Sequence, residues 1–195
     1  MGIIDKINKL KKIDKTFFTF CDLGKILKSK KTSLKKDLGR MVKKGLIRRL
    51  CRDVYILADQ EMDTKKIAAQ LYAPYAYISF ESALSTYGIS NQVPYAVTLA
   101  TFKSTKIREF LESEIILRKI KKELFFGCKL ENGILIAEPE KALLDTLYLK
   151  SKGLAPLNEE ELNLGGLSRK RFLEMSGKFP PRVQKEARRL GKKMR

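Results

Sequence analysis

The N-terminal fold is decided by residues 32–57, TSLKKDLGRMVKKGLIRRLCRDVYIL. The first half of this stretch repeats apolar residues at the spacing of one helix face, and a glycine follows where helices often end. The pattern predicts a helix that is capped by Thr32 or Ser33 and runs to Lys44. The second half, residues 46–57, predicts a two-stranded hairpin with arginines at its tip.

Upstream of this stretch, the sequence predicts two further helices. Residues 2–12 place apolar side chains at helical spacing with lysines outward. A short β-prone stretch, residues 16–20, precedes a second short helix that Asp22 can cap. Three helices followed by a basic hairpin are the element order of a winged helix-turn-helix, which we expect in residues 1–60.

The basic charge is concentrated at the two ends of the chain. The 195 residues include 41 Lys and Arg against 22 Asp and Glu, a formal net charge of +19. Residues 1–60 carry +11, residues 61–150 carry +1 and residues 151–195 carry +7. This distribution indicates that the ends contact an acidic polymer, although a solubilising surface charge is the alternative.

The predicted third helix has one apolar and one cationic face. Its apolar stripe, which includes Val42, lies opposite the basic side chains, so one face packs and the other can contact DNA. We expect the helix to contact bases and phosphates and the hairpin to contact the backbone or the minor groove. The predicted DNA-binding residues are Thr32, Ser33, Lys35, Lys36, Arg40, Lys43, Lys44, Arg48, Arg49 and Arg52. The alternative is a winged helix that is used for protein contact alone.

Composition argues against most catalytic classes. The chain has no histidine, which excludes histidine-dependent catalysis and histidine-ligated metals. Its cysteines, Cys21, Cys51 and Cys128, are far apart and are expected to be small buried hydrophobes. The phosphate-binding glycine motifs are also missing. We therefore predict no catalytic residue, no metal and no cofactor.

The middle segment, residues 61–150, predicts a small α+β domain. Helices are expected at residues 63–71 and 79–88 and from residue 138 onward, and strands at residues 95–100, 115–120, 124–130 and 134–137. Asn132-Gly133 is a strong signal for the turn of a hairpin. No apolar run approaches the roughly 18 residues that a membrane span needs, so a cytoplasmic protein without a membrane partner is expected.

Residues 151–195 predict a basic helical C-terminal tail. Its last helix has a thin apolar stripe, and its other face carries four cations that could make a secondary nucleic-acid contact: Arg182, Lys185, Arg188 and Arg189. A merely solvated terminus and attachment to tRNA or to a protein are the alternatives.

Several segments between residues 15 and 150 together resemble the AbiEi antitoxin family. The most specific are SFESAL at residues 79–84 and EPEKALLD at residues 138–145, and TLAT at residues 98–101 and the stretch 121–127 add to them. The resemblance implies a bacterial abortive-infection toxin-antitoxin system of type IV. Such proteins are bifunctional, because the winged helix represses its own operon through promoter repeats and the rest counteracts a nucleotidyltransferase-like toxin, AbiEii.

The resemblance also implies partners and candidate residues. The partners are double-stranded DNA, on which inverted repeats would favour a dimer, and the toxin, which need not form a stable complex. Candidate residues for the antitoxin function are Ser79, Glu81, Ser82, Lys141 and Asp145. The alternative roles are a helix cap and a packing residue for the serines, and a structural salt bridge for the charged side chains.

Two other functions remain open at this stage. One is a stand-alone winged-helix transcriptional regulator whose middle domain senses a ligand or dimerises. The other is an enzyme that reverses the toxin's modification with Glu81 or Asp145 as acid or base. The expected fold class is α+β, with an N-terminal winged helix-turn-helix, a small α+β antitoxin domain and the basic helical tail.

Overall fold

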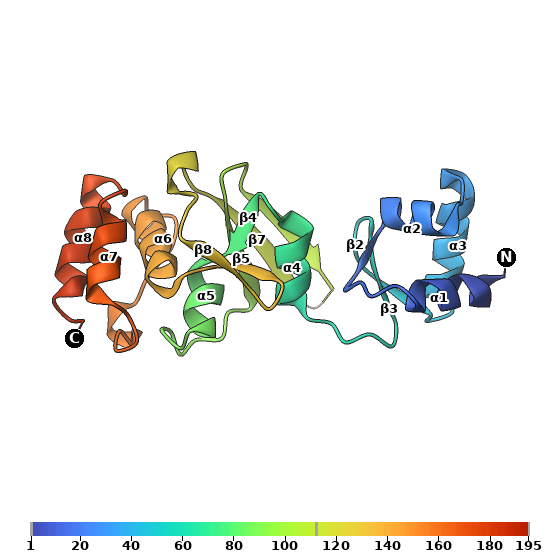
Figure 1. Cartoon of the computed structure of the whole chain (residues 1–195), viewed down its shortest axis with the longest axis horizontal. Helices are drawn as coiled ribbons and strands as arrows, with labels where there is room; N and C mark the ends of the chain where they lie inside the picture. The colour runs from blue at the N-terminus through green and yellow to red at the C-terminus, as the bar shows by residue number, and fades with distance from the viewer. Residues whose placement is uncertain (1, 112, 195) are drawn as a thin grey trace. The chain divides into compact units, whose positions relative to one another are not determined.

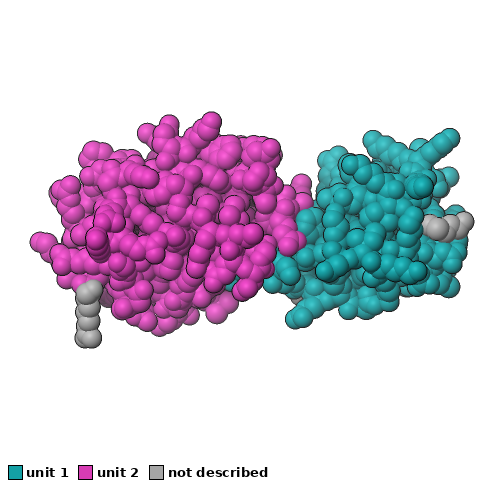
Figure 2. Space-filling view, in the orientation of Figure 1, with its two compact units in different colours: residues 1–67, 109–112 teal, residues 68–108, 113–195 magenta. Residues whose placement is uncertain are grey.

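A computed structural model describes residues 2–111 and 113–194 of the chain (Figure 1). The structure is mixed α+β and contains a three-stranded and a six-stranded sheet. The chain divides into two compact units (Figure 2). The first unit comprises residues 1–67 and 109–112, and the second comprises residues 68–108 and 113–195.

The first unit places three helices before a hairpin. Its elements are α1 (Ile3–Lys11), β1 (Phe18–Thr19), α2 (Phe20–Leu27), α3 (Lys31–Lys43), β2 (Ile47–Cys51) and β3 (Val54–Leu57). The strands form an antiparallel sheet in the order β1-β3-β2. Apolar faces of the helices enclose a common core whose best-buried members are Leu10, Phe18, Leu23, Leu34, Leu38 and Met41. The predicted hairpin is confirmed, with Arg52 and Asp53 in its turn.

Two predicted helix caps in this unit are wrong. The cap of α2 is Thr19, whose Oγ1 accepts a hydrogen bond from the Asp22 amide at 3.1 Å. Asp22 sits three positions later and accepts the Thr19 amide in return at 2.9 Å, so the two residues form a capping box. Helix α3 begins two or three residues earlier than expected, with Lys30 at the N-cap and no side-chain cap bond, so Thr32 and Ser33 lie inside its first turn.

The remaining elements build the second unit around its sheet. They are α4 (Thr64–Tyr72), β4 (Ala76–Ile78), α5 (Phe80–Thr86), β5 (Ala96–Thr101), β6 (Lys106–Phe110), β7 (Ser113–Lys119), β8 (Cys128–Glu131), β9 (Ile134–Ala137), α6 (Pro139–Ser151), α7 (Arg169–Ser176) and α8 (Pro181–Gly191). The strand order is β6-β7-β5-β4-β9-β8. Strand β4 runs parallel to β9 and antiparallel to β5, and β5 runs parallel to β7.

The sequence patterns found most of these elements but missed two strands. Neither β4 nor β6 was expected, because three residues are too few to show alternation and β6 is largely exposed. The strand expected at residues 124–130 begins at Cys128, since residues 122–124 form a 3₁₀ turn. The hairpin at Asn132-Gly133 is confirmed, and both residues have positive φ angles, as that turn type requires.

Helix α6 is the centre of the second unit. Every residue from Glu140 to Leu149 is buried, so the helix has no solvent-facing side over this stretch. Helices α5, α7 and α8 all pack against it. The polar residues that α6 carries therefore lie in the interior and need partners there.

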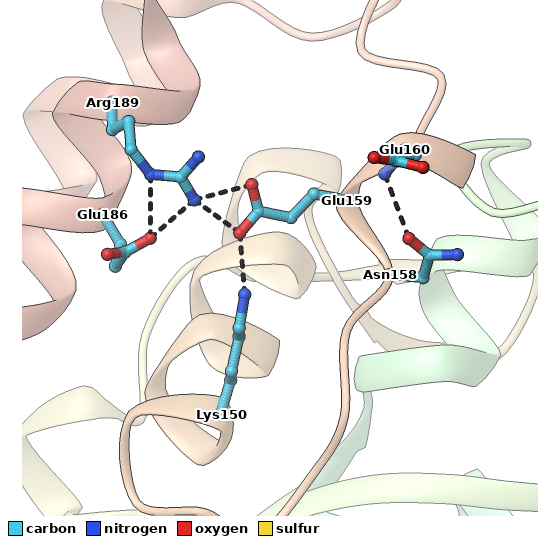
Figure 3. A network of polar contacts seen from close by, with 6 residues as sticks. All are labelled: Lys150, Asn158, Glu159, Glu160, Glu186 and Arg189. Atoms are coloured by element: carbon cyan, nitrogen blue, oxygen red, sulfur yellow. Dashed lines mark hydrogen bonds and ion pairs between the residues drawn. The ribbon is translucent and has the colours of Figure 1, made fainter.

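The C-terminal residues belong to the second unit instead of forming a separate segment beyond residue 150. Helices α7 and α8 pack on α6 through buried side chains, namely Phe172, Phe179, Val183, Ala187 and Leu190. The sequence pattern at residues 159–164 also predicts a helix, but the structure has a single 3₁₀ turn there, Glu159–Glu161. Figure 3 shows how that turn is joined to α8 and α6, because Glu159 accepts hydrogen bonds from Arg189 and Lys150.

Candidate functional sites

The first candidate site is the α3–hairpin region, residues 31–57. This region holds nine lysines and arginines but only two acids, Asp37 and Asp53. Asp37 lies on the buried face of α3, where Lys6 of α1 forms an ion pair with it. The acid is therefore neutralised inside the unit, and the outer surface of the region keeps its positive charge.

The predicted cations on α3 are exposed and have no carboxylate partner among residues 2–111 and 113–194. They are Lys35, Lys36, Arg40, Lys43 and Lys44. By contrast, Lys11 and Lys15, which lie outside the region, form ion pairs with Asp59 and Asp22. The exposed side of α3 can therefore offer its charge to an anionic partner.

The three arginines of the hairpin differ in how readily their side chains can contact a ligand. Arg49 and Arg52 are exposed, and the Arg52 Nε lies 3.8 Å from Asp53 Oδ2 in a long surface contact. Arg48 is half-buried, and its Nη2 donates to the backbone oxygen of Gln60 at 2.8 Å. Arg48 thus braces the unit, and the predicted contact role fits Arg49 and Arg52 better.

The predicted contact residues of α3 occupy two flanks of the helix. At about 100° per residue, Lys35 lies on the flank that faces the hairpin, together with Val42. Ser33, Arg40 and Lys44 lie about 100° or more away from this flank. Val42 was expected to pack inward, but its side chain is 39% exposed because it borders the hairpin side instead of the core.

The second candidate site is a buried polar cluster in the second unit, formed by Lys141, Asp145, Tyr77 and Ser79. Lys141 and Asp145 are one helical turn apart on α6 and form an ion pair with no solvent exposure. The hydroxyls of Tyr77 and Ser79 each donate to Asp145 Oδ2 at 2.9 Å. Lys141 Nζ also donates to the Tyr77 hydroxyl at 2.7 Å. Both carboxylate oxygens are therefore satisfied.

Aromatic rings surround the buried ammonium. Lys141 Nζ lies 5.2 Å from the ring centre of Tyr77, 5.1 Å from that of Phe126 and 5.3 Å from that of Phe179. These distances are within the range of cation–π attraction, which partly replaces lost hydration. Gly127, which has a positive φ, allows the chain to pass close to the stem, since a Cβ there would lie 3.1 Å from Lys141 Cγ.

Burial dominates the ionisation of this cluster. It lowers the pKa of the Lys141 ammonium, although the Asp145 carboxylate beside it opposes the shift. Burial also raises the pKa of the Tyr77 hydroxyl well above its ordinary value, and the neighbouring Asp145 charge adds to this effect. The tyrosine therefore stays protonated at neutral pH and donates to the carboxylate.

The other candidate residues of the antitoxin function also form hydrogen bonds or ion pairs within the second unit. Ser79 is the N-cap residue of α5 by position, but its hydroxyl donates to Asp145 instead of capping the helix. Ser82 is buried, and its Oγ accepts the Thr98 amide at 2.9 Å, which fastens α5 to β5. Glu81 lies outside the cluster, because its carboxylate pairs with Arg118 of β7 at 2.6 Å.

This arrangement favours a structural role over a chemical one for the cluster. A general acid or base must reach a substrate atom within hydrogen-bond distance. Ser79 and Asp145 are fully buried, and Ser82 is 1% exposed. The residues instead join β4, α5 and α6 into one rigid body.

The cations of the C-terminal helix α8 fall into two groups. Arg182, Lys185 and Arg188 are exposed and form no ion pair within the described residues. Arg189 donates through Nη2 to both Glu159 oxygens at 2.5 and 2.6 Å and to Glu186 at 2.7 Å (Figure 3). Its guanidinium is engaged within the protein, and its predicted nucleic-acid contact would require breaking these bonds.

Other classes of site gain no support. Among residues 2–111 and 113–194, no group of three or more histidine, cysteine or acidic side chains could hold a metal ion. In the same part of the chain, no helix has both the length and the apolar character that a bilayer crossing requires. The prediction of buried cysteines is wrong, because Cys21 is exposed and Cys51 and Cys128 are half-buried.

Comparison with known proteins assigns no family. A scan against protein-family models gave no match, and a search of curated proteins also gave none. The likeness to AbiEi antitoxins therefore rests on the sequence segments quoted above. Sequence reasoning missed three site residues, namely Lys6, Tyr77 and Arg118. The alternative of a structural salt bridge holds for Lys141 and Asp145, whose i, i+4 spacing is the local signal for such a pair.

Proposed function

We propose that the chain is a bifunctional antitoxin of a bacterial abortive-infection toxin-antitoxin system. Its first unit would act as a winged helix that binds repeats in its own promoter and represses transcription. Its second unit would neutralise a cognate nucleotidyltransferase-like toxin, without requiring a stable complex. The proposal gives the chain no catalytic step of its own and no cofactor.

One observation carries the DNA-binding half: within the described residues, the exposed lysines and arginine of α3 have no carboxylate partner. The element order supports the same assignment, since three helices precede a hairpin whose sheet is completed by β1. A helix fits the major groove of B-DNA, which is about 12 Å wide. With 13 residues, α3 is about 20 Å long and can follow that groove for several base pairs.

The composition of α3 predicts how the complex depends on salt. Lysines, which dominate its exposed side, act as point charges toward phosphates, whereas Arg40 can form a bidentate contact with a guanine. Each phosphate contact releases counterions and makes the logarithm of affinity fall with the logarithm of salt concentration. We therefore expect tight binding at low salt and a steep loss as salt rises.

The test is binding to the DNA directly upstream of the chain's own coding sequence, titrated at several salt concentrations. Replacing Lys36, Arg40 and Lys43 together by alanine should weaken binding at least about tenfold and make the salt dependence shallower. The control replaces three lysines of the same unit outside the region: Lys9, Lys12 and Lys25. Wild-type affinity in the α3 variant would exclude this helix as the recognition element.

The antitoxin half is supported by the sequence segments at residues 79–84 and 138–145, which contain the N-caps and first turns of α5 and α6. Because Ser79, Lys141 and Asp145 are buried, they would act by holding these two helices in place. Exposed groups on the same unit would then meet the toxin or compete for its substrate.

The matching experiment scores growth when the chain is co-expressed with the gene that follows it. We expect the full chain with the Lys36, Arg40 and Lys43 alanine substitutions to rescue growth, since repression and neutralisation reside in different units. Rescue by folded Glu81→Gln and Asp145→Asn proteins would exclude an enzyme that reverses the toxin's modification. If no variant affects growth and no nucleotidyltransferase-like reading frame lies downstream, the chain is instead a stand-alone regulator.

A further inference from the structure

A groove of about 700 Å³ is enclosed by α3, the start of α2 and the hairpin, all within the first unit. Its floor is apolar, because the lining residues Leu38 and Tyr55 are 2% and 8% exposed and belong to the core. Val42 also lines the groove and leaves its side chain partly open to solvent. An apolar lining that reaches solvent at Val42 is suited to a ligand with an apolar surface.

The rim of the groove is cationic. Lys31 and Lys35 line one side from α3, and Arg49 and Arg52 line the other from the hairpin. All four side chains belong to exposed residues, and Asp53 is the one acid among the described lining residues. A ligand of the groove should therefore combine repeated negative charges with apolar surface between them.

Gly39 lies on the same groove, in the interior of α3. Glycine weakens a helix interior relative to alanine, so its presence needs a reason. Neither of the usual intramolecular reasons applies. Its backbone is ordinary helix without a positive φ, and an added Cβ would meet no neighbouring atom of the described residues within 4 Å.

The helical positions place this glycine beside the cations of the rim. At about 100° per residue, Lys31, Lys35, Gly39 and Val42 fall within an arc of about 80°. Position 39 is thus the one place in this arc where an incoming group can approach the helix backbone without meeting a side chain. The absence of a side chain at position 39 is therefore better explained by ligand binding than by packing within the fold.

We propose that this groove seats the sugar–phosphate backbone of one strand of duplex DNA, with Gly39 as the point of closest approach. The inference rests on the proposed DNA-binding function and assigns the strand's position within it. Phosphates would pair with Lys31 and Lys35 on one side and with Arg49 and Arg52 on the other. The deoxyribose rings between them would lie over the apolar floor, and a side chain at position 39 would stand in the path of the strand.

The test compares the same side chain added at two exposed glycines. Gly39→Gln adds bulk in the groove, and Gly166→Gln adds bulk at an exposed position of the second unit, where an added Cβ would also meet no atom of the described residues within 4 Å. Neither change alters charge. Full-length variants are titrated with a short fluorescent DNA duplex of random sequence over a range of salt concentrations, and their thermal unfolding is recorded as a check of folding.

We expect Gly39→Gln to weaken binding at least about tenfold and to make the salt dependence shallower, because phosphates can no longer reach four cations. Gly166→Gln should stay within about twofold of the wild-type affinity, because it leaves the groove unchanged. Gly39→Ala should raise the unfolding midpoint by about 2–8 °C and still weaken binding, which separates a ligand role from a structural one.

Three results would overturn the inference, and they are distinguishable. If Gly39→Gln binds as tightly as Gly166→Gln while the wild-type chain binds DNA, the strand runs elsewhere and the proposed DNA-binding function stands. If the wild-type chain fails to bind the duplex even at low salt, both the proposed DNA-binding function and this inference are wrong. If an RNA duplex is bound equally well with the same sensitivity to Gly39→Gln, the assignment to DNA is wrong.

Discussion

The α3–hairpin region and the C-terminal helices α7 and α8 are both rich in lysine and arginine, but they use these charges differently. In the first region Asp37 is turned inward and paired, and Asp53 makes only a long contact with Arg52, so the cations of α3 remain available. In the second, carboxylates of neighbouring segments engage part of the exposed charge, as in the pairs Arg171–Glu138 and Arg189–Glu159. The availability of a cation therefore depends on where the fold places its nearest acids.

The comparison extends to the interior, where a charge without its partner is far more costly than at the surface. Asp145→Ala would leave Lys141 buried without its counter-charge and remove the acceptor of Tyr77 and Ser79. We expect a loss of about 3–5 kcal/mol in the free energy of unfolding, measured by urea denaturation. As a control, Asp59→Ala breaks an exposed ion pair with Lys11 and should cost far less, because solvent screens the two charges. A loss for Asp145→Ala as small as that of the control would show that the buried cluster is dispensable.

A smaller effect is expected when the inward-turned acid of α3 loses its partner. Lys6→Ala leaves Asp37 on the buried face of the helix without the ammonium that neutralises it. We expect about 1–3 kcal/mol of destabilisation by urea denaturation, because the carboxylate loses a charged hydrogen-bond donor. Lys9→Ala on the same helix removes an exposed lysine and should change stability by less than about 0.5 kcal/mol. Equal losses in the two variants would contradict the pairing.

Sequence patterns predicted the long and periodic elements and failed where tertiary contacts decide. The periodicity of α3 and the Asn132-Gly133 turn were sufficient to predict their elements, because both signals are local. Asp37 could not be recognised as buried, since its partner Lys6 is 31 residues away in the sequence. The same reason explains why Tyr77 was not joined to Lys141 and why Glu81 was grouped with the wrong partners.

The candidate DNA-binding residues show the same limit. Composition was sufficient to identify the basic region, but the hairpin determines which flank of α3 borders a groove. That information depends on how α3 packs against β2, so Lys31 and Gly39 were missed and Arg48 was included although it is turned toward Gln60. Helical geometry can divide a helix into flanks, but it cannot tell which flank its neighbours leave open.

The ion pair between Arg189 of α8 and Glu159 should make the stability of the second unit depend on pH. The hydrogen bond from Arg189 lowers the pKa of Glu159 against the opposing effect of burial, and Lys150 adds to the lowering. A carboxylate with a lowered folded pKa stabilises the fold above its unfolded pKa, about 4.5, and this contribution is lost as the pH falls through the lowered value. Glu159→Gln should remove this dependence of stability on pH. It should also lower the free energy of unfolding by about 0.5–1 kcal/mol at neutral pH, measured by thermal unfolding from neutral pH down to below the lowered pKa. The exposed neighbour Glu160→Gln is the control and should keep the wild-type pH profile.

The smallest effect concerns the cations of α8 themselves, and it tests the comparison most directly. Arg188 and Arg189 are neighbours in sequence with the same charge, but Arg188 has no carboxylate partner within the described residues and Arg189 has two. If the C-terminal helices make a secondary nucleic-acid contact, Arg188→Ala should weaken DNA binding about twofold to threefold and reduce the salt slope by about one. Arg189→Ala should leave both quantities close to wild type while lowering the unfolding midpoint, because its charge is already used inside the protein. Equal losses of binding in the two variants would mean that DNA competes successfully with Glu159 and Glu186, so that pairing in the free protein does not determine which cations a nucleic acid can recruit.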